Sequence, residues 1–325
     1  MKRAAILGFG FAFGLLLVFG IERFFFSRDY REELPPCLEI GEPYHHRFRA
    51  NCTGELATPT GTVPFSVNDD GFRDLPRAQI LKQRQRVLVA GDSFVEGWWV
   101  AADQALPSLL SAALPSKYFI NAGLRSTGPV LQSARLKPLL EAYRPQLLLW
   151  VLNDTDGLDD RFACAVAKNG GGFGAPEFAM QGWRKGIAEL LGNTSAGDRV
   201  RRAAYLEEWQ RLVDSPAAAG CDACRGVRDF QRLAKAAGVK MFVVYLAKGF
   251  PDPGRNYAQA RPPRQELLEC LAKEGLTPYL AAVEGENYYW EGDFHLNPEG
   301  LASLAGALAA QLKEREASGA GKTSR

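Results

Sequence analysis

Ser93 and His295 are the two residues of this sequence whose types and settings could support nucleophilic chemistry. Ser93 follows the apolar run Val87–Ala90 in the stretch VLVAGDSFVEGWW, and His295 lies in WEGDFHLNPEG. A serine hydroxyl is a weak nucleophile near neutral pH, so it needs an adjacent base, usually histidine, to accept its proton. The only other histidines, His45 and His46, are neighbours in an irregular segment. The sequence therefore pairs Ser93 with His295; the alternative is that Ser93 only caps a helix.

A histidine that acts as a base also needs a group that orients its ring. Asp293 lies two residues before His295 and can fold its short side chain back toward Nδ1, whereas Glu291 and Glu299 are less well placed. We therefore expect Asp293 to complete a catalytic triad with Ser93 and His295.

Acyl transfer requires hydrogen-bond donors for the negative charge that develops on the carbonyl oxygen. The backbone N–H groups of Ser93 and Gly123 are candidates, and Gly123 has no side chain to block a close approach. Asn153 follows the run QLLLWVL and offers a side-chain amide; its alternative role is that of a plain turn residue. We expect strand ends to deliver these groups to one rim.

The elements that must bring these residues together alternate between strands and helices from about residue 85 onward. The stretch 146–152 is apolar on both faces of a strand, which predicts a central position in a sheet. Such alternation is typical of an α/β fold whose parallel sheet gathers the carboxyl ends of its strands at one edge. The expected strands are Arg86–Ala90, Tyr118–Asn121, Gln146–Leu152, Lys240–Ala247 and Pro278–Val283. The expected helices are Ala102–Leu114, Val130–Tyr143, Arg228–Ala237, Gln265–Glu274 and a closing helix with Asn297 as its N-cap.

Residues 1–26 predict a membrane anchor. Lys2 and Arg3 precede Ala4–Ile21, a run without any charge that approaches the length of a membrane-spanning helix. The two basic residues favour a cytoplasmic N-terminus, so the rest of the chain would lie on the periplasmic or extracytoplasmic side. A cleaved signal peptide and a buried core helix are the alternatives.

The remaining segments differ in composition. Residues 27–84, rich in Pro, Gly, Thr and charge, predict an irregular juxtamembrane linker before a main domain at 85–315. Residues 155–225 interrupt the alternation with helical stretches and predict an insertion over one end of the sheet. The small, polar residues 316–325 predict a disordered tail.

Six cysteines in a chain that we expect to be exported predict disulfides. Cys37 with Cys52 is the first pairing to expect, because it closes a loop in a turn-rich segment. The stretch CDAC, from Cys221 to Cys224, could be half a zinc site, a redox pair or a tight disulfide. No second pair of ligands is spaced for zinc, so we favour a structural role.

Composition excludes one class of partner. The chain has 39 basic and 37 acidic residues, and no long basic run interleaves with aromatic residues, so no nucleic-acid interface is expected. Trp98, Trp99 and the run Tyr288–Trp290 flank the two catalytic motifs. Their rings could stack on sugar rings, or could simply pack against apolar surface.

The motifs together resemble the SGNH superfamily, also called GDSL esterases. The resemblance rests on GDSF after the first strand, Gly123 after the second, ND after the third and DFHLN before the last helix, and spans about Arg86–Leu312. It implies a three-layer, flavodoxin-like parallel sheet of about five strands flanked by helices, with an inserted helical segment. Two positions depart from the family pattern: Val151 replaces a usual glycine, and Gly292 stands where the acid usually lies.

The resemblance also implies an activity that uses no metal and no cofactor. It implies Ser93 as nucleophile, Gly123 and Asn153 as oxyanion donors, and His295 as the base with Asp293. The expected function is an esterase that acts on an acylated small molecule or glycan through an acyl-serine intermediate. The alternatives are a polysaccharide O-acetyltransferase with the same triad, and a non-catalytic envelope protein that binds a glycan or a partner. The sequence carries no signal for an oligomeric state.

Overall fold

The computed structural model describes residues 36–40, 46–83, 85–168, 211, 221–246, 263–290 and 295–320. The chain divides into two compact units, and all described residues except Arg211 belong to the larger, Pro35–Phe173 with Pro216–Arg325. The expected anchor at 1–26, Asp293 and most of the expected insertion at 155–225 lie outside the described residues. Within the described ranges, no helix combines the length and apolar character needed to cross a membrane.

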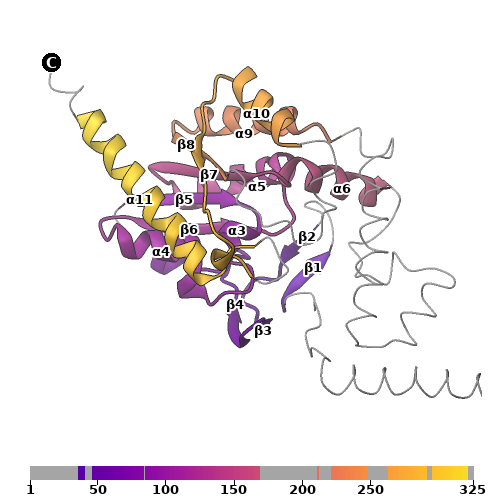
Figure 1. The fold of residues 1–325 in the computed structure, drawn as a ribbon, viewed down its shortest axis with the longest axis vertical. Helices are drawn as coiled ribbons and strands as arrows, with labels where there is room; N and C mark the ends of the chain where they lie inside the picture. Colours follow the sequence, from indigo (N-terminus) through magenta and orange to yellow (C-terminus); the bar gives the residue numbers. More distant parts are fainter. Residues whose placement is uncertain are drawn as a thin grey trace, which may run out of the picture. The chain divides into compact units, whose positions relative to one another are not determined.

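The described residues contain one parallel sheet of five strands in the order β6-β5-β7-β8-β9 (Figure 1). This order is that of flavodoxin-like folds, in which the first strand lies between the second and the third. The predicted fold class is therefore confirmed, and the expected strands match the observed ones within one or two residues at each end. The strands are β5 (Arg86–Gly91), β6 (Tyr118–Gly123), β7 (Leu147–Asn153), β8 (Lys240–Leu246) and β9 (Tyr279–Ala281).

Helices cover both faces of the sheet and create three layers (Figure 1). Successive side chains of a strand point to opposite faces, so the apolar run of β7 serves two cores at once. Leu149 and Val151 join one core, and Leu148, Trp150 and Leu152 join the other. The first core packs under α4 (Leu106–Ala113) and α11 (Pro298–Ala320); the second packs under α5 (Pro129–Tyr143), α9 (Ala223–Ala236) and α10 (Pro263–Lys273).

Trp150 anchors the second core. Its ring stacks on Phe230 of α9 with centroids 3.8 Å apart and planes 9° apart, and its Nε1 donates to Gln132 Oε1 at 2.6 Å. A buried indole is thus satisfied both by packing and by a hydrogen bond, as buried tryptophans usually are.

The chain order places a topological switch point between β5 and β7. The chain leaves β5 toward β6 on one side, then crosses to β7 on the other side of β5. Loops diverge at such a point and leave a crevice at the carboxyl ends of the strands, where open α/β sheets bind their ligands. Ser93 follows β5 and Asn153 ends β7, so both lie at this edge.

Residues 27–84 do not form the irregular linker that the sequence predicts, because four strands lie within them. One antiparallel pair joins β1 (Leu38–Ile40) to β2 (His46–Phe48), and another joins β3 (Thr53–Thr58) to β4 (Gly61–Ser66). The prediction fails because these strands are short, and because Gly54 and Pro64, residue types that are typical of turns, lie inside them. Four of the buried residues of this part form one cluster with Leu124, which follows β6; they are Phe48, Leu56, Phe65 and Val67.

The closing helix α11 extends to Ala320, so the predicted disorder of 316–325 is corrected as far as that residue. Two contacts favour the longer helix. Lys117 Nζ lies 2.7 Å from Glu316 Oε1, and Ser318 Oγ donates to Glu314 O at 2.8 Å. Small residues at the end of the sequence are compatible with a helix as well as with a tail, and composition alone cannot separate these outcomes.

All six cysteines form disulfides. Cys37 pairs with Cys52, which confirms the expected pairing and links the two hairpins. Cys221 and Cys224 have separate partners, Cys164 and Cys270, so CDAC is neither a mutual disulfide nor half a zinc site. The favoured structural role of CDAC is confirmed.

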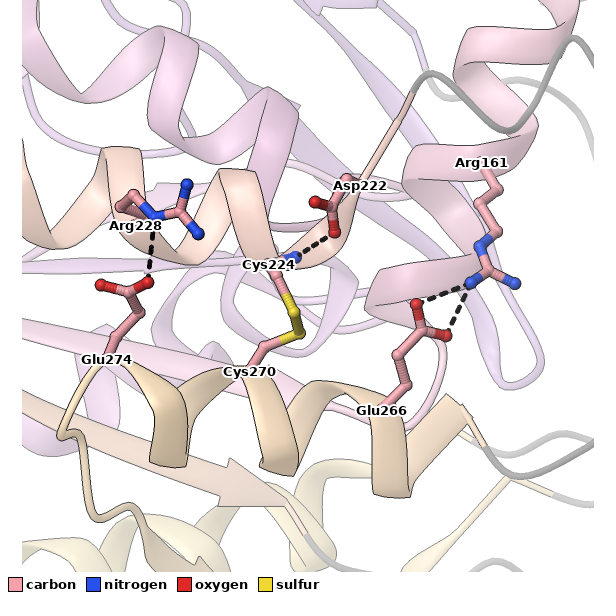
Figure 2. Close-up of a disulfide and its surroundings, with 7 residues drawn as sticks. All are labelled: Arg161, Asp222, Cys224, Arg228, Glu266, Cys270 and Glu274. Atoms are coloured by element: carbon pink, nitrogen blue, oxygen red, sulfur yellow. Dashed lines mark hydrogen bonds and ion pairs between the residues drawn. A yellow bond between two sulfur atoms is a disulfide. The ribbon is translucent and has the colours of Figure 1, made fainter.

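Figure 2 shows how the Cys224–Cys270 disulfide joins α9 to α10. The ion pair of Arg228 with Glu274 lies beside it and joins α9 to the residue that follows α10. The ion pair of Arg161 with Glu266 links α10 to α6 (Asp156–Lys168). Cys164–Cys221 joins α6 to the segment just before α9. These helices are therefore cross-linked beside the sheet.

Candidate active site

Ser93 and His295 meet at the carboxyl edge of the sheet. Ser93 Oγ lies 2.9 Å from His295 Nε2, although the two residues are 202 positions apart. Ser93 is the first residue of α3 (Ser93–Glu96), and His295 precedes α11. Their exposed fractions are 5% and 6%. A hydroxyl held against an imidazole nitrogen can transfer its proton as it attacks, so the structure brings the candidate nucleophile and the candidate base together.

Asp92, not Ser93, caps the helix. Asp92 Oδ1 accepts a hydrogen bond from Phe94 N at 3.0 Å, and Oδ2 lies 3.3 Å from Ser93 Oγ. Burial raises the pKa of Asp92, and the Phe94 N–H, the Asn153 amide and the His295 charge oppose that rise. The alternative role of Ser93 as a helix cap therefore belongs to Asp92. The Ser93 hydroxyl contacts His295 instead of the start of the helix.

Asn153 contacts Asp92, the residue that directly precedes Ser93. Its Nδ2 donates to Asp92 Oδ2 at 2.9 Å and to Asp156 Oδ1 at 3.3 Å. Its backbone N donates to Asp156 Oδ2 at 2.9 Å. Both amide protons therefore point at carboxylates, and stabilisation of an oxyanion by Asn153 requires release of one contact, the longer one to Asp156 being the weaker.

Gly123 has a different setting from the one expected. Its N–H donates to Asn121 Oδ1 at 3.1 Å, and a side chain at this position would overlap the backbone of Val95 and Glu96. The glycine thus lets α3 approach β6 closely. As for Asn153, donation by the Gly123 N–H to an oxyanion requires release of its present contact, and Asp293, the expected triad acid, lies outside the described residues.

Aromatic rings surround the His295 imidazole. The Trp98 ring stacks on it with centroids 4.8 Å apart, and the rings of Phe94 and Trp99 lie at 5.4 and 6.2 Å. The carbonyl oxygen of His295 accepts from Trp290 N at 3.1 Å. Asn297 Oδ1 accepts from the Gly300 N–H at 2.9 Å, so this asparagine caps α11 as the sequence predicts. The loop that carries the base is therefore held by both packing and capping.

An acidic cluster lies behind Asn153 and was not predicted. Asp92, Asp156 and Asp159 have carboxylate oxygens within 4.8 Å of one another. Burial raises the pKa values of Asp156 and Asp159 well above the ordinary range, and the charge of Asp92 raises them further. Their described hydrogen bonds come from Phe94, Ser93, Asn153 and Thr155. The signal that could have found the cluster is the stretch NDTDGLDD, in which acids recur on one face of a helix start.

A buried ion pair near the site was also missed. Glu96 is 0% and Arg125 is 4% exposed. Glu96 Oε1 accepts from Arg125 Nε at 3.0 Å, and Glu96 Oε2 accepts from the Arg125 backbone N at 2.7 Å. A glutamate between the apolar residues of FVEGWW was a signal, because a buried carboxylate requires a cation or several donors.

Comparison with known proteins gives matches among solved structures alone: no family model and no curated protein matches the chain. TesA is 17% identical with a TM-score of 0.42, over 71% of this chain and 99% of that chain. A member of the lipolytic protein G-D-S-L family from Veillonella parvula is 11% identical with a TM-score of 0.40, over 71% and 100%. The psychrotrophic esterase EstA from Pseudoalteromonas, in a structure inhibited by monoethylphosphonate, is 12% identical with a TM-score of 0.41, over 71% and 98%.

The solved structures that this chain resembles therefore include G-D-S-L lipolytic proteins and an esterase, and the motifs around Ser93 and His295 resemble the same family in sequence.

Proposed function

We propose that this protein is a serine esterase that acts through an acyl-serine intermediate. The observation that carries the proposal is the 2.9 Å contact of Ser93 Oγ with His295 Nε2 at the switch point of the sheet. Both groups are nearly buried, so the developing charges would be stabilised by protein dipoles in a site with little water.

The reaction follows from this contact. Ser93 Oγ attacks the ester carbonyl carbon while His295 Nε2 accepts the hydroxyl proton, and a tetrahedral oxyanion forms. When the intermediate collapses, the C–O bond to the alcohol breaks and His295 returns the proton to the leaving oxygen. Water then attacks the acyl-Ser93 carbonyl as His295 accepts its proton, and the acid leaves with Ser93 restored. We propose the Asn153 amide and the N–H groups of Ser93 and Gly123 as oxyanion donors, and Asp293 as the group that orients His295.

We further propose that the substrate is a short acyl ester, such as an acetyl ester, on a glycan of the cell envelope. Trp99 lies close to the base, with its ring centroid 6.2 Å from that of His295, and is only partly buried. Aromatic faces can stack on the apolar faces of sugar rings. If a sugar hydroxyl replaces water in the second half-reaction, the same residues perform O-acetyl transfer.

We also propose that the domain lies outside the cytoplasm, held by residues 1–26 in the membrane. Three disulfides support an oxidising compartment, and the uncharged run 4–21 supports an anchor. Protease added to spheroplasts should therefore digest the large domain. Full protection of that domain, with a periplasmic marker digested in the same sample, would contradict the topology.

The decisive experiment uses the detergent-solubilised full chain with p-nitrophenyl acetate and with a fluorophosphonate that labels activated serines. We expect turnover, covalent labelling on Ser93 by peptide mass spectrometry, and loss of both in Ser93→Ala with an unchanged melting temperature. Adding oligosaccharide acceptors separates the two reactions, because transfer yields an acetylated sugar in place of acetate. A folded wild-type chain with neither turnover nor labelling would favour the non-catalytic alternative.

A further inference from the structure

The side chain of Trp98 lies between His295 and Arg125, and its only hydrogen bond among the described residues is that of the backbone N–H to Ser93 O at 3.1 Å. Its ring stacks on His295 with planes only 13° apart, and the Arg125 guanidinium carbon lies 4.2 Å from the centroid of the same ring. Its Nε1 is buried and has no partner in the part of the chain that the structure describes. Because an unpaired buried N–H is costly, ring contacts rather than side-chain hydrogen bonding must account for the position of the Trp98 ring.

Arg125 is itself fixed from two sides. Glu96 accepts from both the side chain and the backbone of Arg125, and the Arg125 carbonyl oxygen accepts from His46 Nε2 at 2.7 Å. Glu96 ends the short helix that Ser93 begins. The contacts therefore lead from Ser93 back to its own helix. Ser93 contacts His295, whose ring stacks on Trp98. The Trp98 ring packs against Arg125, and Arg125 pairs with Glu96 at the end of the helix that Ser93 begins.

The turn that carries Trp98 is held by Arg73. Arg73 Nη1 donates to Gly97 O at 2.5 Å, and Nη2 donates to Val100 O at 2.9 Å. Between these carbonyls, Trp99 has a φ of 56°, a left-handed conformation that is costly for an aromatic residue. Surrounding contacts must impose such a conformation, and Arg73 supplies two of them from the segment before β5.

We infer that Trp98 is a positioning residue for the base His295, with the Arg125–Glu96 pair fixing Trp98; this inference rests on the proposed esterase function. The hydrogen bond to Ser93 sets the direction of the imidazole within its plane, and the stack on Trp98 sets the plane itself. Proton transfer depends steeply on such alignment. The indole face also attracts the imidazolium that forms when His295 accepts the serine proton, as aromatic faces attract cations.

The test compares Trp98→Met, which fills the space without a plane, with Trp98→Phe, which restores a ring. Trp150→Phe is the matched control, since it alters a stacked tryptophan in the other core. The full chain is assayed for kcat and KM with p-nitrophenyl acetate and for the rate of Ser93 labelling by a fluorophosphonate, each per titratable site. Trp98→Met should lower kcat and the labelling rate together, by about ten- to a hundredfold, with KM within about threefold.

Trp98→Phe should recover most of both rates, and Trp150→Phe should leave both unchanged per site even if it lowers the melting temperature. The inference is wrong if folded Trp98→Met keeps its kcat within about twofold, or if only KM changes. Should Trp98→Met not fold, Arg125→Lys decides: it keeps the charge but loses the planar fork, and an unchanged kcat there contradicts the inference. Failure of the esterase proposal is distinct, because wild type would then show no Ser93-dependent turnover at all.

Discussion

Asn153 Nδ2 donates to Asp92 Oδ2 at 2.9 Å, so the last residue of β7 holds the residue that directly precedes the nucleophile. The same aspartate caps α3 through the Phe94 N–H and borders Ser93 Oγ. One buried carboxylate thus fixes the helix start and the amide that we propose as an oxyanion donor. Its contribution to catalysis can be separated from its contribution to stability.

Asp92→Ala should lower kcat by about a hundredfold, because both Ser93 and the Asn153 amide lose the group that positions them. It should also lower the free energy of unfolding by about 1 kcal/mol, the usual cost of losing an N-cap. Asp222→Ala is the matched control: Asp222 caps α9 through the Cys224 N–H at 2.9 Å (Figure 2). Urea unfolding and ester turnover are measured on both, and equal losses of kcat would assign Asp92 a purely structural role.

Asp160 predicts a pH dependence of stability. Burial raises the pKa of Asp160 from 3.8 to about 7, although hydrogen bonds from the backbone of Val130 and Leu131 oppose the rise. Between these pH values the folded chain holds a proton that the unfolded chain has released. The free energy of unfolding should therefore fall as pH rises from about 4 to about 7, by about 1.4 kcal/mol for each pH unit at most.

Asp160→Asn should flatten this dependence, since an amide accepts a hydrogen bond without titrating. The raised pKa values of Asp156 and Asp159 act in the same direction, so part of the slope should remain. Urea unfolding across the pH range measures it, with Asp103→Asn, an exposed aspartate, as the control. An Asp160→Asn slope as steep as that of wild type would show that another group carries the proton.

Asp293 is the predicted triad acid. Asp293→Asn should lower kcat by about four orders of magnitude if this side chain orients His295, as loss of a triad aspartate can. Glu291→Gln should have a much smaller effect, because Glu291 is four residues from His295. Steady-state kinetics with p-nitrophenyl acetate decides. A mild effect at Asp293 with a severe one at Glu291 would exchange their roles, and mild effects at both would leave a Ser93–His295 dyad.

The strands of the sheet were predictable because their signal is local. The apolar run before Asn153 is buried on both faces whatever helices cover it, and the boundaries of β7 moved by a single residue. Ser93 and His295 were predictable for a related reason: strand ends of a parallel sheet converge, and few histidines were available. The pairing of Ser93 with His295 could therefore be predicted without knowing how the side chains pack.

The rest depended on contacts between distant residues. Phe65 lies in a strand that resembles a loop in sequence, and its burial depends on Phe48 and on Leu124 beyond β6. The N–H of Gly123 is taken by Asn121, which only the local conformation at the end of β6 determines. Nothing in the sequence distinguished Arg125 from other charged residues. Its importance follows from its pairing with Glu96, 29 positions earlier, which only the fold brings about.

The segment before β5 should consequently be part of the catalytic unit, and Arg73 is the residue with which to test this. Burial lowers the pKa of Arg73 to about 10, so its guanidinium is still charged at neutral pH. It bonds the carbonyl oxygens of Gly97 and Val100, on either side of the two tryptophans. Arg73→Met should lower the free energy of unfolding by about 3 kcal/mol, because the charge-assisted hydrogen bonds of Arg73 are lost and the carbonyls of Gly97 and Val100 are left in a buried site.

The same variant should lower kcat by about tenfold in its folded fraction, since the turn that carries Trp98 loses its outer support. Arg47→Met is the matched control: its side chain is 56% exposed and pairs with Glu39, which is 36% exposed, and an exposed ion pair is worth about 1 kcal/mol at most. Urea unfolding gives the stability difference, and kinetics per fluorophosphonate-titrated site gives kcat. If Arg73→Met matches Arg47→Met in both measurements, the segment before β5 is an attachment to the sheet domain and has no part in holding the base.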